Sequence, residues 1–248
     1  LLTFDGSLFG GASGTDDVTI NINTYTSGPY QTVSGGYDNK AIGNFSTISG
    51  GYSNTNSGNY SVIAGGENNT AMGDCSVISG GRNNTTSIYA CNSYIGGGYS
   101  NTLTCNFGVI SGGRWNTGTC YRTFIGNGDC NTTSCYSSIV VGGGYNIASN
   151  TASSVVGGCV NTASGKYSFI GNGTFNTVSG CYSTISGGYD NTLTGTYSSI
   201  VGGYSNVGLV YNGFIGGGYA NTTNATFSFI GNGSSNTTFG YTSVIGGG

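Results

Sequence analysis

A repeat of fifteen residues governs most of this 248-residue chain. An Asn recurs from Asn39 to Asn236 at intervals of 15, with one exception of 17 between Asn84 and Asn101. A Gly stands three residues before each of these Asn residues, and an Ile or Val stands six residues before each. The consensus is Tyr-Ser-x-Ile-x-Gly-Gly-x-x-Asn-Thr-x-Ser-Gly-x, and the two extra residues of the long interval predict a bulged loop.

The repeat predicts an all-β fold. The chain has 50 Gly, and this density of Gly beside β-branched residues disfavours helices. Copies of equal length that cannot bury their own apolar face stack on one another. Residues 30–248 are therefore predicted to form a parallel β-solenoid (a β-roll or β-helix) of about 14 rungs that continues beyond residue 248. Residues 1–29 do not follow the period and are expected to form a cap or a docking strand.

The alternation of side chains along a strand predicts an inside and an outside for each rung. In the copy at residues 60–63, Ser61 and Ile63 are expected inside the coil, and Tyr60 and Val62 outside it. An alternative interpretation places the aromatic residues inside a wider coil and leaves a monomer.

The outer residues form an apolar stripe that is larger than the apolar surface a soluble monomer normally exposes. We expect this stripe to pack against other copies of the chain, most simply in a trimer of parallel coils. If the stripe is exposed instead, its Tyr residues suit a glycan on a host surface. The stripe contains Phe45, Tyr60, Val62, Val77, Phe107, Val109, Phe124, Tyr167, Phe169, Tyr182, Tyr197, Phe214, Phe227 and Phe229.

The repeats that begin YSVIAGG and YSTISGG, and continue as NTAMG and NTLTG, resemble the head repeats of trimeric autotransporter adhesins (the YadA-like head) and related repeats of viral and phage fibres. The resemblance covers residues 30–248. It implies three parallel left-handed β-rolls and a structural or adhesive role on a cell or virion surface. The sequence departs from that family in its 15-residue period, which is longer than the common one, and in its many Cys and aromatic residues.

The composition argues against several classes of function. Nucleic-acid binding requires a basic surface, whereas the chain has five Lys and Arg residues, eight Asp and Glu residues and a net charge of −3. No stretch approaches the roughly 20 apolar residues of a membrane-spanning helix. The chain has no His, so a Ser or Cys nucleophile lacks its usual base and a zinc site is not expected. We therefore expect a non-enzymatic protein without cofactors.

Eight Cys residues indicate an extracellular, cell-surface or virion-surface protein, because disulfides persist in oxidising surroundings. Disulfides within or between chains are expected to staple a thin coil, and free, packed thiols are the alternative. Cys105, Cys120 and Cys135 lie four residues after the repeat Asn in successive copies, where the spacing of rungs suits a disulfide. The other candidates are Cys75, Cys91, Cys130, Cys159 and Cys181, and the sequence leaves the pairing open.

The residue after the repeat Asn suggests a second function. It is Thr in 11 of 14 copies, and Ser or Thr often follows two residues later. This double row of hydroxyl groups resembles the Thr-x-Thr face of β-solenoid ice-binding proteins, although hydroxyl ladders also stabilise sheets without binding anything. Lys40, Ile147 and Val207 interrupt the first row. The row contains Thr55, Thr70, Thr85, Thr102, Thr117, Thr132, Thr162, Thr177, Thr192, Thr222 and Thr237.

Overall fold

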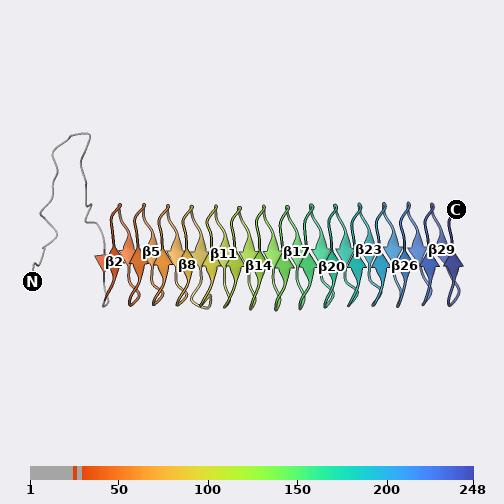
Figure 1. The fold of residues 1–248 in the computed structure, drawn as a ribbon, viewed down its shortest axis with the longest axis horizontal. Helices are drawn as coiled ribbons and strands as arrows, with labels where there is room; N and C mark the ends of the chain where they lie inside the picture. The colour runs from red at the N-terminus through yellow and green to blue at the C-terminus, as the bar shows by residue number, and fades with distance from the viewer. Residues whose placement is uncertain (1–24, 27–29) are drawn as a thin grey trace, which may run out of the picture. The chain divides into compact units, whose positions relative to one another are not determined.

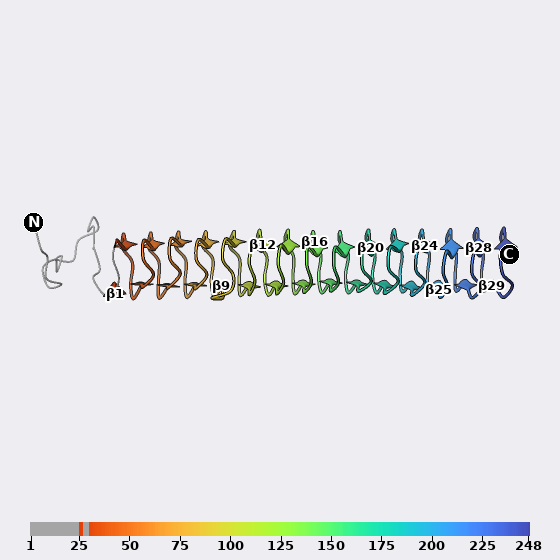
Figure 2. The same ribbon diagram turned by 90° about the horizontal axis from the view of Figure 1, so that it is seen from below.

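The computed structural model describes residues 25–26 and 30–248, and this part of the chain contains strands and turns but no helix (Figure 1). The fold is an all-β parallel β-solenoid of about 14 coils, as the repeat predicts. The chain divides into two compact units, Leu1–Asn106 and Phe107–Gly248. In each unit the odd-numbered strands form one sheet, here sheet A, and the even-numbered strands form a second, sheet B. Figure 2 shows the two sheets as two layers joined by turns.

Every strand is two residues long, so none is stable without its neighbours in the stack. In the first unit, sheet A contains β1 (Tyr25–Thr26), β3 (Lys40–Ala41), β5 (Thr55–Asn56), β7 (Thr70–Ala71), β9 (Thr85–Thr86) and β11 (Thr102–Leu103). Sheet B of that unit contains β2 (Thr32–Val33), β4 (Thr47–Ile48), β6 (Val62–Ile63), β8 (Val77–Ile78) and β10 (Tyr94–Ile95).

The second unit continues the same order of elements. Its sheet A contains β13 (Thr117–Gly118), β15 (Thr132–Thr133), β17 (Ile147–Ala148), β19 (Thr162–Ala163), β21 (Thr177–Val178), β23 (Thr192–Leu193), β25 (Val207–Gly208), β27 (Thr222–Thr223) and β29 (Thr237–Thr238). Its sheet B contains β12 (Val109–Ile110), β14 (Phe124–Ile125), β16 (Ile139–Val140), β18 (Ser154–Val155), β20 (Phe169–Ile170), β22 (Thr184–Ile185), β24 (Ser199–Ile200), β26 (Phe214–Ile215), β28 (Phe229–Ile230) and β30 (Val244–Ile245).

Within each unit, every strand pairs in parallel with the strand one coil away. Thr177 of β21 lies opposite Thr192 of β23, at an offset of one repeat. In the first unit, Ile95 of β10 lies opposite Ile78 of β8, so the offset there includes the two extra residues. The connection between β9 and β10 accommodates them in a bulged loop, as predicted, and the side chains of Ile88 and Tyr89 in it are exposed.

The second residue of each strand from β2 to β30 faces a narrow interior. On sheet B this residue is Ile or Val in every strand, and on sheet A it varies among Ala, Val, Leu, Thr, Asn and Gly. Ser61 and Ile63 are fully buried, while Tyr60 is exposed. The prediction of an apolar column inside the coil is therefore confirmed, and the wider coil with aromatic residues inside is not formed.

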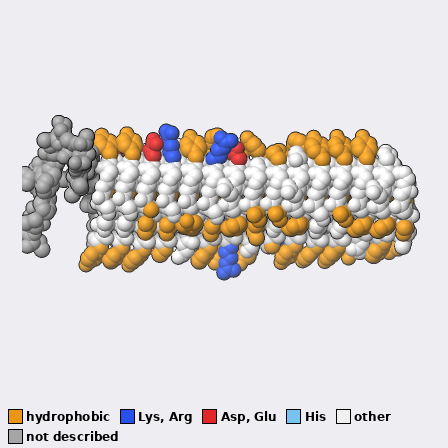
Figure 3. Space-filling model, turned by 45° about the horizontal axis from the view of Figure 1, so that its top comes forward, with side chains coloured by type: hydrophobic (Ala, Val, Ile, Leu, Met, Phe, Trp, Pro, Cys, Tyr) orange, Lys and Arg blue, Asp and Glu red, His pale blue; other side chains and the backbone are white. Residues whose placement is uncertain are grey.

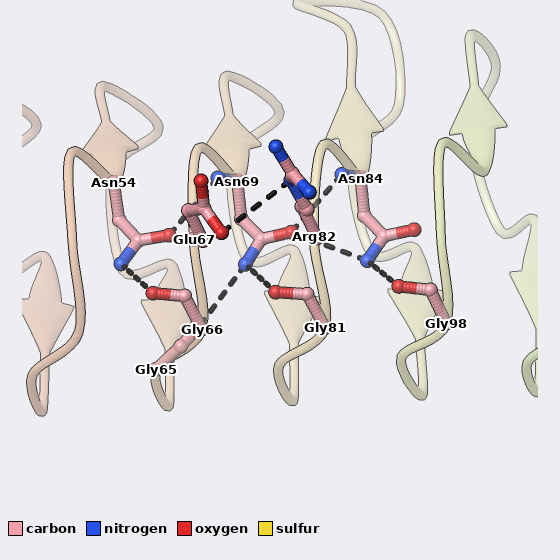
Figure 4. Close-up of polar contacts among 9 residues, drawn as sticks. All are labelled: Asn54, Gly65, Gly66, Glu67, Asn69, Gly81, Arg82, Asn84 and Gly98. Carbon is pink, nitrogen blue, oxygen red and sulfur yellow. Dashed lines mark hydrogen bonds and ion pairs between the residues drawn. The ribbon is translucent and has the colours of Figure 1, made fainter.

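The repeat Asn residues form a buried ladder of side chains that hydrogen-bond successive coils to one another (Figure 4). The side-chain amide of Asn69 donates to the carbonyl oxygens of Gly65 at 3.0 Å and Gly81 at 2.9 Å. Its Oδ1 accepts from the backbone N–H of Asn84 at 3.0 Å and from the Asn84 amide at 3.1 Å. Because a buried polar group without partners is costly, only a side chain with both donors and an acceptor suits this column.

Each coil turns two corners at residues with positive φ. At one corner, Tyr182 has φ +53 and its backbone N–H donates to the carbonyl of Lys166, which lies in the preceding coil. Two residues later, the N–H of Thr184 donates to Ser198 in the following coil. The left-handed conformation thus reverses the direction of hydrogen bonding at this corner. A positive φ recurs at the equivalent residue of every described coil, whatever the residue type.

The cap or docking strand expected over residues 1–29 falls outside the described residues, apart from β1. That strand pairs in parallel with β3, with Tyr25 opposite Lys40.

Candidate functional surfaces

The outer face of sheet A carries the Thr row expected from the sequence. In the second unit, Thr162, Thr177 and Thr192 stand opposite one another in successive strands, and their side chains are half-buried. Ile147 and Val207 occupy the same position in β17 and β25. Both are β-branched like Thr, so the row keeps its shape where the hydroxyl group is lost.

The outer face of sheet B carries half of the predicted apolar stripe. Each residue of this half is the first residue of its strand. It lies opposite the first residue of the strand in the next coil, as Phe214 lies opposite Phe229. Phe214 and Phe229 stack with ring centroids 5.0 Å apart and planes 3° from parallel. The stripe residues on this face are Val62 and Val77 in the first unit and Val109, Phe124, Phe169, Phe214 and Phe229 in the second.

The other half of the predicted stripe lies at the corner that precedes sheet B. Tyr167, Tyr182 and Tyr197 have positive φ and stack with centroid separations of 4.9 and 5.0 Å. They are about half exposed. The predicted stripe is therefore two separate columns, since the left-handed turn removes these residues from the strand. The corner members are Phe45, Tyr60, Phe107, Tyr167, Tyr182, Tyr197 and Phe227.

A third aromatic column was missed by the sequence reasoning. It lies in the turn that follows sheet B, where Tyr189, Tyr204 and Tyr219 stack at 5.1 and 5.4 Å, and Tyr37 and Tyr52 stack at 5.4 Å in the first unit. The sequence does contain a pattern that indicates this column, because each of these Tyr residues follows a pair of Gly residues. Isolated β-bridges in the turn set their spacing.

Most charged side chains lie in the turns, and some of them form ion pairs. Arg114 Nη2 is 2.8 Å from the Asp129 carboxylate, and Arg82 Nε is 3.4 Å from that of Glu67 (Figure 4). On the face seen in Figure 3, the charged side chains gather on the outer rows, and the hydrophobic row between them carries none. Exposed pairs of this kind contribute little stability. The described strands themselves carry one charged residue, Lys40 in β3, so the outer faces of the sheets are nearly free of charge.

One titratable group in the second unit is perturbed. A hydrogen bond with the Cys130 side chain raises the pKa of Tyr145 above its usual value, and negative charge on Cys130 and Asp129 adds to the effect. The Arg114 guanidinium acts in the opposite direction and lowers that pKa. Because Tyr145 is an exposed residue, this cluster lacks the enclosed surroundings of an active site.

The candidate cysteines lie in the turns and corners of the coils. Cys91, Cys130 and Cys135 contact Ile88 O, Asp129 Oδ1 and Thr151 Oγ1 through sulfur at 3.6 to 3.8 Å. Cys105 belongs to the first unit, while Cys120 and Cys135 occupy equivalent turns of successive coils in the second. Cys75, Cys159 and Cys181 lie at three different positions of the repeat. The formation of disulfides by these residues remains a prediction, and their pairing remains open.

Within the described residues, no group of three or more His, Cys, Asp or Glu side chains could hold a metal ion, and no helix could span a membrane. No protein-family model matches the chain, and no curated protein matches it. Three surfaces are the candidates for function: the Thr row, the outer face of sheet B and the aromatic corners.

Proposed function

We propose that this protein is a non-enzymatic structural segment of an extracellular fibre or filament, displayed on a cell or virion surface, whose copies associate with one another. The observation that carries the proposal is the outer face of sheet B, where apolar side chains recur in coil after coil and remain partly exposed. Phe124, Ile139, Phe169 and Phe229 each expose 36–39% of their surface in the second unit.

The rest of the molecule supports a structural role. Most coils repeat the same interior, in which one Ile or Val, one Asn and one Ser or Thr are buried. Identical coils are an economical way to extend a surface, because each coil contacts only its neighbours and another can be added without changing them. Apolar columns that run along such a stack are suited to partners with the same repeat.

Sedimentation velocity of the full chain, over a range of concentrations, tests this proposal. We expect oligomers whose population grows with concentration, and filaments or oligomers in negative-stain images. A chain that stays a compact monomer at all concentrations contradicts the proposal.

Ice binding is a second candidate, and one observation favours it. The first residue of every sheet A strand from Thr55 to Thr237 is β-branched, and 11 of these 13 residues are Thr. Strands in a sheet repeat at about 4.8 Å, so within each unit these methyl and hydroxyl groups form a regular, uncharged row. The hydroxyl groups of such a row have a fixed spacing, which can match the spacing of ordered water molecules.

Thermal hysteresis of the chain tests ice binding. We expect Thr177→Lys in β21 to abolish it, because a long charged side chain would stand above the row. Thr184→Lys in β22 is the matched control, since Thr184 faces outward from the opposite sheet. Absence of hysteresis in the unmodified chain, or equal loss in both variants, contradicts the ice-binding candidate.

A further inference from the structure

Side-chain size on the outer face of sheet B is compensated within many coils, although Ile139 and Val141 share one coil and are both large. The two outward positions of a coil are the first residue of the strand and the residue two places later. Wherever the first is aromatic, the second is Gly, in the pairs Tyr94 with Gly96, Phe124 with Gly126, Phe169 with Gly171, Phe214 with Gly216, and Phe229 with Gly231. Where the first is Ser, the second is Val, in the pairs Ser154 with Val156 and Ser199 with Val201.

The geometry explains the aromatic pairs. A Cβ at Gly171 would lie 3.5 Å from Cε1 of Phe169, and the corresponding separations at Gly126, Gly216 and Gly231 are 3.4, 3.6 and 3.5 Å. These separations are ordinary van der Waals contacts, and a Cβ at each Gly would also collide with the backbone carbonyl oxygen of the next coil. The ring and that carbonyl together leave no place for a second side chain in these coils. The remaining coils mostly carry two side chains of small or medium size, such as Thr184 with Ser186. The result is a face of nearly even height.

This face also carries no charge. Among the described residues, no Lys, Arg, Asp or Glu occupies either outward position of sheet B. Lys166 and Arg122 lie in the turn before the sheet, where each stands over a Tyr ring. A face that is level, mostly apolar and uncharged can be covered by an identical face without burying an unpaired charge.

We infer that the outer face of sheet B in the second unit packs against the same face of a second copy of this chain, as two sheets packed face to face. This inference rests on the proposed self-association and specifies the surface and the partner. Two such sheets lie about 10 Å apart, with their side chains interdigitated. Because a level face is fully covered by one other level face, the unit of assembly is a pair related by a twofold axis.

The available area suits a pair of moderate affinity. The ten sheet B strands of this unit span about 45 Å at the usual strand spacing. A face about 10 Å wide then buries roughly 900 Å² over two copies, close to the lower limit of about 1,000 Å² for a specific interface. The exposed aromatic corner beside the face enlarges the contact. We therefore expect a dissociation constant of about 1–100 μM for the pair.

Two isoleucines provide a matched test. Ile139 in β16 faces outward from sheet B and Ile147 in β17 faces outward from sheet A, and their exposed fractions are 36% and 38%. Sedimentation equilibrium of the full chain gives the dissociation constant. We expect Ile139→Lys to raise this constant at least about 100-fold, since each of the two copies then places a lysine in the apolar interface. Ile147→Lys is expected to change it less than about threefold.

The outcomes separate this inference from the proposed function. A trimer, or an oligomer that tolerates Ile139→Lys or is disrupted by Ile147→Lys, overturns face-to-face pairing but leaves self-association standing. A chain that is monomeric at every concentration overturns both. Circular dichroism and thermal unfolding establish that each variant is folded. If Ile139→Lys does not fold, Ser199→Lys introduces the same charge from a half-exposed, small side chain on the same face, and its failure to weaken the pair also overturns the inference.

Discussion

Two adjacent glycines in the second unit should differ greatly in their tolerance of a methyl group. Gly188 has φ +100, and a Cβ there would collide with the carbonyl oxygen of Gly203 in the next coil and lie 2.6 Å from Asn191 Nδ2. That carbonyl accepts hydrogen bonds from the Tyr189 N–H at 2.9 Å and from the Asn191 amide at 3.0 Å. At Gly187, in contrast, the nearest atom to a Cβ is Asn172 O at 3.8 Å.

The magnitude follows from these contacts. Holding Ala at such a φ costs about 1–3 kcal/mol, and each of the two displaced hydrogen bonds costs about 0.5–1.5 kcal/mol. We therefore expect Gly188→Ala to lower the free energy of unfolding by about 2–6 kcal/mol. Gly187→Ala should stay within about 1 kcal/mol of the unmodified chain.

Urea unfolding followed by circular dichroism measures the difference, and hydrogen exchange locates it. Stacked repeats can open locally, so protection of the Tyr189 amide should fall in Gly188→Ala and persist in Gly187→Ala. Equal destabilisation by the two substitutions would refute the reasoning, because it would mean that the close approach of coils at Gly188 does not determine the turn.

Three further outcomes are expected in the second unit. Asn176→Asp should destabilise the fold by at least about 3 kcal/mol at neutral pH, and less in acid, because a protonated carboxyl group recovers one of the donors of the ladder; urea unfolding at two pH values measures this. Ile185→Ala should cost about 2–5 kcal/mol, whereas Thr184→Ala, which is half-buried on the outer face, should cost at most about 1 kcal/mol. Cys130→Ala should lower the pKa of Tyr145 towards its usual value, as observed by NMR titration of labelled Tyr. In the unmodified chain, the stability linked to Tyr145 should be present below the unfolded pKa near 10 and be lost as pH rises through the raised folded value.

The regular interior could be predicted from the sequence because every coil buries the same kinds of residue at the same positions of the repeat. Ile63 lies in a column that is apolar in every copy, and Asn69 lies in one that is always Asn, so their burial follows from the period alone. The extra residues near Tyr89 could also be placed, since only an exposed loop absorbs an insertion without shifting the next strand.

The outside could be predicted only in part. Tyr60 and Val62 were assigned to one stripe because they are two residues apart, but alternation holds only along an extended chain. Tyr60 has φ +55, and the strand begins at Val62. A Tyr at positive φ is uncommon, and it is tolerated here because its N–H reaches Asn44 in the preceding coil at 2.8 Å. That bond between coils is not visible in the sequence of one copy.

The outer positions are where function can be distinguished from folding. A buried Asn or Ile is required by the coils on either side, so its recurrence indicates nothing about a partner. The Gly that accompanies each Phe on sheet B has a partial explanation within the chain, because a Cβ at Gly171 would also collide with the carbonyl of Ser186. Yet Val156 and Val201 occupy the same position in coils with the same strand register. In those two coils the fold accepts a side chain at this position. The pairing of Gly with an aromatic ring, and of Val with Ser, is the pattern that we expect of a surface that fits against another surface.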